Sequence, residues 1–140
     1  MTTSVDSNVL ATLWDEKDTF NLEVRKLLDE ISESSRLVIS GVVYAELLAA
    51  PGRSEDFLEH FLDRTGIRVD WQIGEDILRM AGLRFRAYIA RRKRSHNELP
   101  RRILADFIIG AHAESNGYAL LTLDQRLYKA AFPNLLVADI

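Results

Sequence analysis

Apolar and polar positions alternate along the chain in a pattern that predicts short strands separated by helices. Apolar runs of strand length occur at residues 2–5, 36–40, 66–70, 118–123 and 135–139. Helical spacing of apolar residues predicts helices at residues 8–14, 17–34, 41–50, 53–64, 72–93 and 101–116, with a short helix before Pro133. Short apolar strands alternating with helices indicate a parallel sheet covered on both faces. We therefore expect one α/β domain over residues 1–140, with four to five parallel strands flanked by helices.

Composition and charge narrow the class of protein. The 47% hydrophobic and 28% charged content is typical of a globular domain. No apolar run reaches the roughly 18 residues of a membrane span, and no signal peptide is visible, so we expect a cytoplasmic protein without a membrane partner. The absence of cysteine excludes disulfides, thiol catalysis and thiolate zinc sites. The three histidines are widely spaced, which argues against a histidine metal site.

The charge is unevenly distributed. Residues 84–102 carry eight of the eighteen Lys and Arg and one acid, Glu98, so this segment is net +7 and the remainder is net −10. A basic segment on an acidic protein can bind a polyanion. A solvated helix end followed by a loop explains the same charges equally well.

Four carboxylates stand apart from the other acids because their neighbours are apolar or small. They are Asp6, Glu46, Asp106 and Asp124. Asp6 and Asp124 each follow a predicted strand, and ligands of such sheets bind at the carboxyl ends of the strands. Glu46 has only valines and alanines one helical turn away, so we expect the helix at 41–50 to be buried nearly all round. A helix N-cap or a buried salt bridge could explain any one of the four.

The four acids together predict a metal site. An ionised carboxylate among apolar residues is costly unless it is paired or binds a cation, and these apolar segments contain no Lys or Arg. Oxygen ligands select Mg²⁺ or Mn²⁺. Such a cation is suited to phosphoryl chemistry because it activates water and stabilises charge on the phosphate. We expect His112 to be a hydrogen-bonded residue at the edge of the core, and Gly110 and Ala113 to admit a neighbouring segment.

Four motifs carry a resemblance to a known family. They read "VDSNVL", "VVYAELLAA", "ADFIIGAHA" and "LLTLDQRLYKAAFPNL". In this order and at these spacings they resemble a PIN domain, most closely the VapC toxins of bacterial type II toxin–antitoxin modules. The resemblance spans the whole chain. It implies a Mg²⁺- or Mn²⁺-dependent endoribonuclease that hydrolyses RNA phosphodiester bonds with an activated water.

The resemblance also implies roles for individual residues. The four acids would be the catalytic metal ligands, Asn8 would complete an Asp-x-Asn motif, and Thr122 would support a carboxylate or a water through its hydroxyl. Asp124 stands where the family often has asparagine, and Leu127 stands where a later aspartate would be. Three arginines of the basic segment, Arg91, Arg92 and Arg94, are candidates for gripping RNA, with solubility as the alternative.

The resemblance further implies partners. These are a cognate VapB-like antitoxin that inserts a basic side chain into the acidic pocket, an RNA substrate and a second copy of the chain. Two other functions remain open at this point. One is a non-catalytic PIN-like module that binds RNA or a partner. The other is a Mg²⁺-dependent phosphatase of haloacid-dehalogenase type with Asp6 as nucleophile, which would want a second aspartate where Asn8 stands.

Overall fold

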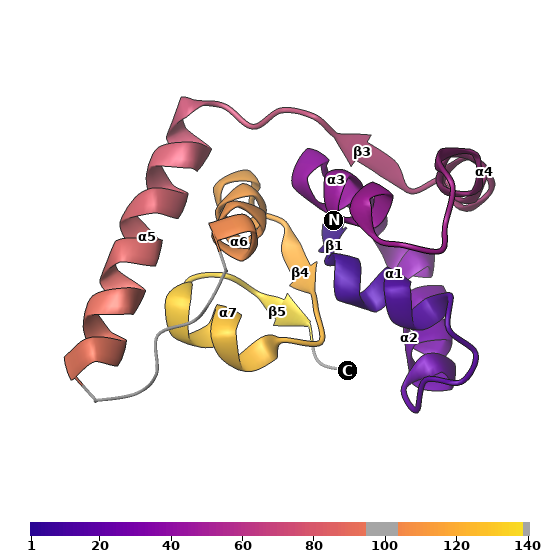
Figure 1. The fold of residues 1–140 in the computed structure, drawn as a ribbon, viewed down its shortest axis with the longest axis horizontal. Helices are drawn as coiled ribbons and strands as arrows, with labels where there is room; N and C mark the ends of the chain where they lie inside the picture. The colour runs from indigo at the N-terminus through magenta and orange to yellow at the C-terminus, as the bar shows by residue number, and fades with distance from the viewer. Residues whose placement is uncertain (95–103, 139–140) are drawn as a thin grey trace.

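Five parallel strands form one sheet in the order β3-β2-β1-β4-β5 (Figure 1). The computed structural model describes residues 1–94, except for the side chain of Arg94, and residues 104–138. Within them the strands are β1 (Thr2–Val5), β2 (Arg36–Ser40), β3 (Arg68–Asp70), β4 (Ala119–Leu121) and β5 (Val137–Ala138). The α/β fold with a helix-flanked parallel sheet is therefore confirmed.

Helices cover both faces of this sheet. They are α1 (Ser7–Leu13), α2 (Asn21–Ser34), α3 (Gly41–Ala49), α4 (Glu55–Thr65), α5 (Glu75–Arg94), α6 (Leu104–Asn116) and α7 (Gln125–Ala131). Figure 1 shows α1–α4 on one side of the sheet and α5–α7 on the other. This division follows from the right-handed connections between parallel strands. The chain crosses the sheet from β1 to β3 in one direction and from β3 to β5 in the other, so the helices of the two crossings cover opposite faces. No helix among the described residues is long and apolar enough to cross a membrane.

The direction in which strands are added to the sheet changes between β1 and β4, which are parallel neighbours. β2 and β3 follow β1 toward one edge of the sheet, and β5 follows β4 toward the other edge. Their registered pairs run from Thr3 with Ala119 to Val5 with Leu121, so both strands end side by side. In open α/β sheets, such a switch point leaves a crevice at the carboxyl ends of the strands where ligands bind. The topology therefore places the residues after β1 and β4 at the position where a site is expected.

The core joins the sheet to the helices on both sides. Ile39 of β2, Leu120 of β4 and Phe107 of α6 are fully buried. The Phe107 ring contacts Phe85 of α5 edge-on, with 5.2 Å between ring centroids, and lies 5.4 Å from Phe132. These contacts fix α6 between α5 and the C-terminal part of the chain.

Two sequence-based expectations need correction. The helix predicted at 17–34 begins at Asn21, because the side chains of Asp15 and Asp18 accept backbone hydrogen bonds from Lys17 and Phe20 and form turns instead. The helix at 41–50 is not buried nearly all round. Val43 and Leu47 are its buried residues, while Leu48 is 39% exposed, because α3 packs on the core with one face only.

Candidate active site

Asp6 connects the ends of the two central strands. Its backbone N–H donates to the carbonyl of Leu121 at 2.9 Å, and its side chain is 3% exposed. Oδ1 accepts from the Ser7 N–H at 2.8 Å, which caps α1, and Oδ2 accepts from the Thr122 hydroxyl at 2.8 Å. Asp6 is thus both a helix cap and a buried carboxylate at the switch point of the sheet.

Thr122 organises the turn between β4 and α7. Its hydroxyl is fully buried, donates to Asp6 and accepts from the Asp124 N–H at 3.0 Å. Asn8 braces the same turn, because its Oδ1 accepts from the Leu123 N–H at 3.2 Å and its Nδ2 lies 3.5 Å from the Thr122 hydroxyl. These bonds hold the start of α1 against the turn that carries Asp124, which is exposed. Thr122 therefore contacts the Asp6 carboxylate directly, whereas Asn8 contacts the turn that carries Thr122.

Glu46 approaches the same region from α3. Its Oε1 accepts a hydrogen bond from the Ser7 hydroxyl at 3.1 Å, so the residue after Asp6 touches Glu46 directly. Asp106 lies in the first turn of α6 and, like Glu46, is half-buried. The two helical acids come from opposite sides of the sheet, since α3 and α6 cover different faces (Figure 1).

Electrostatic effects connect the four acids. Burial raises the pKa of Asp6 to about 6. The hydrogen bonds from Thr122 and Ser7 act in the opposite direction, and the negative charges of Glu46 and Asp124 raise this pKa further. Burial also raises the pKa of Tyr128 in α7 above its ordinary value, as do the charges of all four acids, Asp6, Asp106, Asp124 and Glu46. Because the charges of all four acids act on the Tyr128 hydroxyl, their side chains lie in the same region of the molecule.

The chemistry of these side chains fits a hard divalent cation. Their donors are carboxylate oxygens, which Mg²⁺ and Mn²⁺ prefer. Asp6 forms no ion pair within the described part of the chain, and a cation would relieve the cost of burying its charge. In the described residues no three His, Cys, Asp or Glu side chains are already arranged as a formed metal site. The residues therefore fit the cation by donor type and charge, in a cluster that is not drawn together around an ion.

The candidate RNA-binding arginines lie at the end of α5. Arg91 donates to the Ala130 carbonyl at 3.3 Å and Arg92 donates to the Tyr88 hydroxyl at 3.3 Å. These contacts support the packing of α5, so both residues have a structural role in addition to any role with RNA. The side chain of Arg94 and the rest of the basic segment at residues 95–102 lie outside the described residues.

Two further residues singled out in the sequence, His112 and Gly110, have structural roles. His112 is fully buried, and its Nε2 lies 3.0 Å from Asp70 Oδ2, which confirms a hydrogen-bonded histidine. A Cβ at Gly110 would lie 2.5 Å from the Phe132 ring, which shows that this glycine admits a neighbouring segment.

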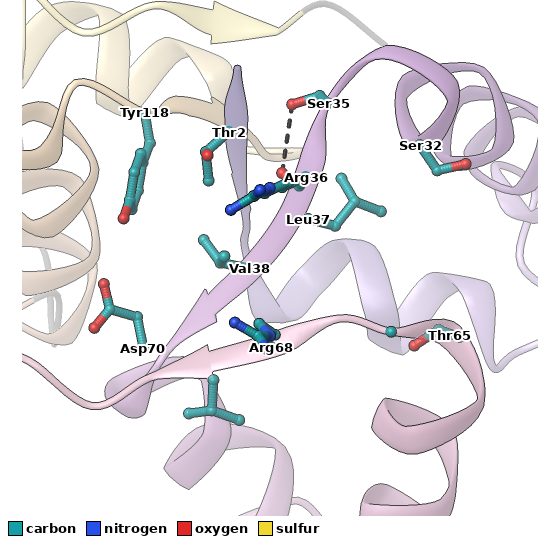
Figure 2. Close-up of a pocket in the computed structure, with 12 residues that line it drawn as sticks. Thr2, Ser32, Ser35, Arg36, Leu37, Val38, Thr65, Arg68, Asp70 and Tyr118 are labelled. Atoms are coloured by element: carbon teal, nitrogen blue, oxygen red, sulfur yellow. Dashed lines mark hydrogen bonds between the residues drawn. The ribbon is translucent and has the colours of Figure 1, made fainter.

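The structure also contains a cavity of about 710 Å³, whose lining residues are drawn in Figure 2. Its lining includes Thr2, Arg36 and Arg68, which begin β1, β2 and β3, and Tyr118, which precedes β4. These residues mark the amino ends of the strands, opposite to the ends that carry Asp6 and Asp124. None of the four acids lines this cavity.

Tyr128 is a residue of this neighbourhood that the sequence reasoning missed. The available signal was its spacing, because it follows Asp124 by one helical turn. Only the fold shows that Tyr128 is fully buried and that the charges of the four acids act on its hydroxyl.

Comparisons with known proteins agree with this geometry. A family model described as PIN domain matches residues 4–133. Among solved structures, the chain resembles VapBC2 from Rickettsia felis bound to a promoter DNA fragment (18% identity, TM-score 0.71, covering 100% of this chain and 99% of that one). It also resembles DNA-bound VapBC from Salmonella typhimurium (21%, 0.68, 99% and 98%) and VapC20 from Mycobacterium tuberculosis, described as a sarcin-ricin loop cleaving toxin (17%, 0.59, 94% and 95%). No curated protein sequence matches the chain. At these identities the structural likeness shows the fold.

Proposed function

Because the chain belongs to the PIN domain family, we propose that it is a metal-dependent endoribonuclease, the toxin of a VapBC-type toxin–antitoxin module. The observation that supports this proposal is the hydrogen-bonded group at the switch point of the sheet, where Thr122 and the Ser7 N–H bind the Asp6 carboxylate and the Ser7 hydroxyl binds Glu46. The VapC20 neighbour, described as a toxin that cleaves the sarcin-ricin loop, supports an RNA substrate.

The four carboxylates would hold Mg²⁺ or Mn²⁺, which when bound makes a water nucleophilic and neutralises charge on the scissile phosphate. Thr122 fixes the Asp6 carboxylate from one side and the Ser7 N–H fixes it from the other. The Ser7 hydroxyl does the same for Glu46. These bonds hold two acids from distant parts of the chain in fixed orientations, which lowers the entropy cost of binding a cation.

The same proposal assigns a cognate antitoxin as protein partner. The VapBC neighbours are toxin–antitoxin assemblies, and this chain has a groove that a partner helix could cover. The groove lies between α1–α2 and α4. It is lined by the apolar and aromatic side chains Leu13, Trp14, Phe57 and Phe61 and by the polar side chains Glu16, Arg25, His60 and Arg64. Phe57 is 40% exposed, which is a large apolar exposure for a surface without a partner.

A homodimer is also part of the proposal, and the outer face of α3 supports it. Leu48 is 39% exposed, and Trp71, which packs edge-on against Tyr44 with 5.0 Å between ring centroids, is 62% exposed. Exposed apolar and aromatic side chains of this kind are typical of interfaces. Sedimentation of the purified chain would test this expectation directly.

An RNA cleavage assay tests the catalytic proposal. We expect the purified chain to cut RNA with Mg²⁺ or Mn²⁺ and to stop on addition of EDTA. Glu46→Gln should abolish cleavage and leave the circular dichroism spectrum unchanged, whereas Glu30→Gln, on the exposed face of α2, should leave cleavage intact.

The outcomes separate the candidate functions. Cleavage that survives both EDTA and Glu46→Gln would refute the metal mechanism. RNA binding by the folded chain without any cleavage would identify a non-catalytic PIN-like module. The phosphatase alternative predicts hydrolysis of small phosphate esters, and it is weakened because the chain belongs to the PIN domain family.

A further inference from the structure

Tyr128 has a buried hydroxyl that finds no hydrogen-bond partner within residues 1–94 and 104–138. It is 0% exposed and sits in α7, four residues after Asp124, so both residues are on one face of the helix start. Helical side chains lean toward the N-terminus of their helix. The Tyr128 side chain is therefore directed toward the turn that carries Thr122 and Asp124, and Thr122 is bonded to Asp6.

The hydroxyl of Tyr128 is buried and forms no hydrogen bond to any residue that the structure describes. Two other tyrosine hydroxyls in the chain are bonded, since Tyr44 donates to Glu59 at 2.6 Å and Tyr88 accepts from Arg92 at 3.3 Å. A buried hydroxyl without a partner is costly, and phenylalanine would fill the same space without that cost. The position of the hydroxyl therefore requires an explanation other than packing.

The surroundings of the hydroxyl point to its partner. The charged groups that act on it are the four carboxylates of the candidate active site, and each of them raises the pKa of Tyr128 in addition to the effect of burial. A phenol kept protonated in this way can donate a hydrogen bond but has no acid–base role near neutral pH. Donors to charged oxygens make the stronger hydrogen bonds in proteins.

We propose that Tyr128 is a positioning residue of the carboxylate site, whose hydroxyl donates a hydrogen bond to the oxygens that gather there around a divalent cation. This inference rests on the proposed metal-dependent function. Among the described residues no three of these acids are arranged as a formed metal site, and the Tyr128 hydroxyl is a buried donor on which the charges of all four act. Groups that orient metal ligands commonly contribute about 10- to 100-fold to metal affinity.

Cation binding by Tyr128→Phe tests the inference without relying on activity. Phenylalanine keeps the ring that packs 6.2 Å from Phe132 and removes only the hydroxyl. Tyr118→Phe is the matched control, because Tyr118 lies at the amino end of β4, where it lines the cavity of Figure 2. Mn²⁺ affinity is measured by calorimetry and Mg²⁺ affinity by displacement of Tb³⁺, whose emission is excited through nearby tyrosines.

We expect Tyr128→Phe to bind Mn²⁺ and Mg²⁺ about 10-fold or more weakly than the wild type. Its thermal midpoint in EDTA should be unchanged or higher, since an unpaired buried hydroxyl has been removed. Tb³⁺ bound at saturation should also emit less on tyrosine excitation in Tyr128→Phe, while Tyr118→Phe behaves as the wild type. The tryptophans absorb in the same range but are present in all three proteins, so the difference reports the tyrosine removed.

Unchanged cation affinity in Tyr128→Phe would overturn the inference, because a residue that only packs would give that result.

If Tyr128→Phe does not fold, the wild type alone tests the inference. Tb³⁺ emission that is stronger on tyrosine excitation than on tryptophan excitation would support a tyrosine close to the bound ion. Emission that is not stronger on tyrosine excitation would overturn the inference. Failure of the wild type to bind any cation would remove both this inference and the proposed function. Mg²⁺-dependent RNA cleavage with unaltered affinity in Tyr128→Phe would remove this inference alone.

Discussion

Replacing Asp6 by asparagine should stabilise the protein at neutral pH while removing the proposed RNA cleavage. The reason is that the folded chain holds this carboxylate in an unfavourable place. Its side chain is 3% exposed, and its pKa is raised from 3.8 to about 6, first by burial. A raised pKa for an acid means that folding favours its neutral form, so ionisation of Asp6 reduces the stability of the folded state.

The magnitude follows from the two pKa values. A difference of about 2 pKa units corresponds to about 3 kcal/mol at 1.36 kcal/mol per unit. The folded chain binds more protons than the unfolded chain between pH 3.8 and 6, so this contribution is fully present below the lower value and is lost above the higher one. Asparagine stays neutral but loses one of the two hydrogen bonds accepted by Asp6, which costs about 1 kcal/mol. The net expected gain near pH 7.5 is therefore about 2 kcal/mol.

Urea denaturation in EDTA at pH 4 and pH 7.5 measures this difference. Asp6→Asn should be more stable than the wild type at pH 7.5 and slightly less stable at pH 4, where Asp6 is protonated in the folded wild type. Asp63→Asn, at an exposed position of α4, should show no such reversal. Added Mg²⁺ should stabilise the wild type by mass action and have less effect on Asp6→Asn.

An equal difference between Asp6→Asn and the wild type at both pH values would refute this reasoning. It would mean that burial does not disfavour the charge of Asp6, and the described balance between burial and its two hydrogen bonds would be wrong. Loss of stability at pH 7.5 would show instead that the Thr122 bond outweighs burial.

Two further substitutions test the packing and the support of the site. Gly110→Ala brings a methyl group to 2.5 Å from the Phe132 ring, so it should cost about 1–3 kcal/mol of stability in urea denaturation, and adding Phe132→Leu should recover part of the loss. Thr122→Val removes the hydrogen-bond donor to Asp6, so the pKa of Asp6 should rise further. The pH-rate profile of RNA cleavage should then shift to higher pH, and cleavage should be about 10- to 100-fold slower. Thr122→Ser keeps the hydroxyl and should restore both the pH profile and the rate. Activity of Thr122→Val equal to that of the wild type would contradict a supporting role.

The strands and most helices could be predicted from the sequence because their apolar patterns are strong and their ends are marked. Ser40, the last residue of β2, illustrates this. Its hydroxyl accepts a hydrogen bond from the Val43 N–H at 3.3 Å and caps the start of α3, as a serine directly before an apolar helical pattern predicts. The exposure of α3 could not be predicted, because an apolar helix leaves one face uncovered only where no other element packs on it. That depends on tertiary contacts such as the one between Tyr44 and Trp71.

The four acids could be selected from the sequence because each contrasts with its apolar neighbours. The closeness of Asp6 to the turn that carries Asp124 follows from topology, since β1 and β4 are adjacent and end together. The unequal burial of the acids could not be read in the same way. Asp6 is buried and Asp124 is exposed although both follow apolar strands, because Asp6 lies directly after β1 whereas Asp124 lies three residues after β4 and begins α7.

The burial of Asp6 and that of Tyr128 are two parts of one physical conflict. The fold buries both an acid and a phenol, so the acid is poorly solvated and the phenol finds no hydrogen-bond acceptor among the residues that the structure describes. The folded protein would be more stable with asparagine in place of Asp6, or with phenylalanine in place of Tyr128. Natural sequences keep such unfavourable groups where a ligand offsets their cost. A divalent cation would do this for both, because it neutralises the carboxylates and gathers oxygens that can accept the tyrosine hydrogen bond.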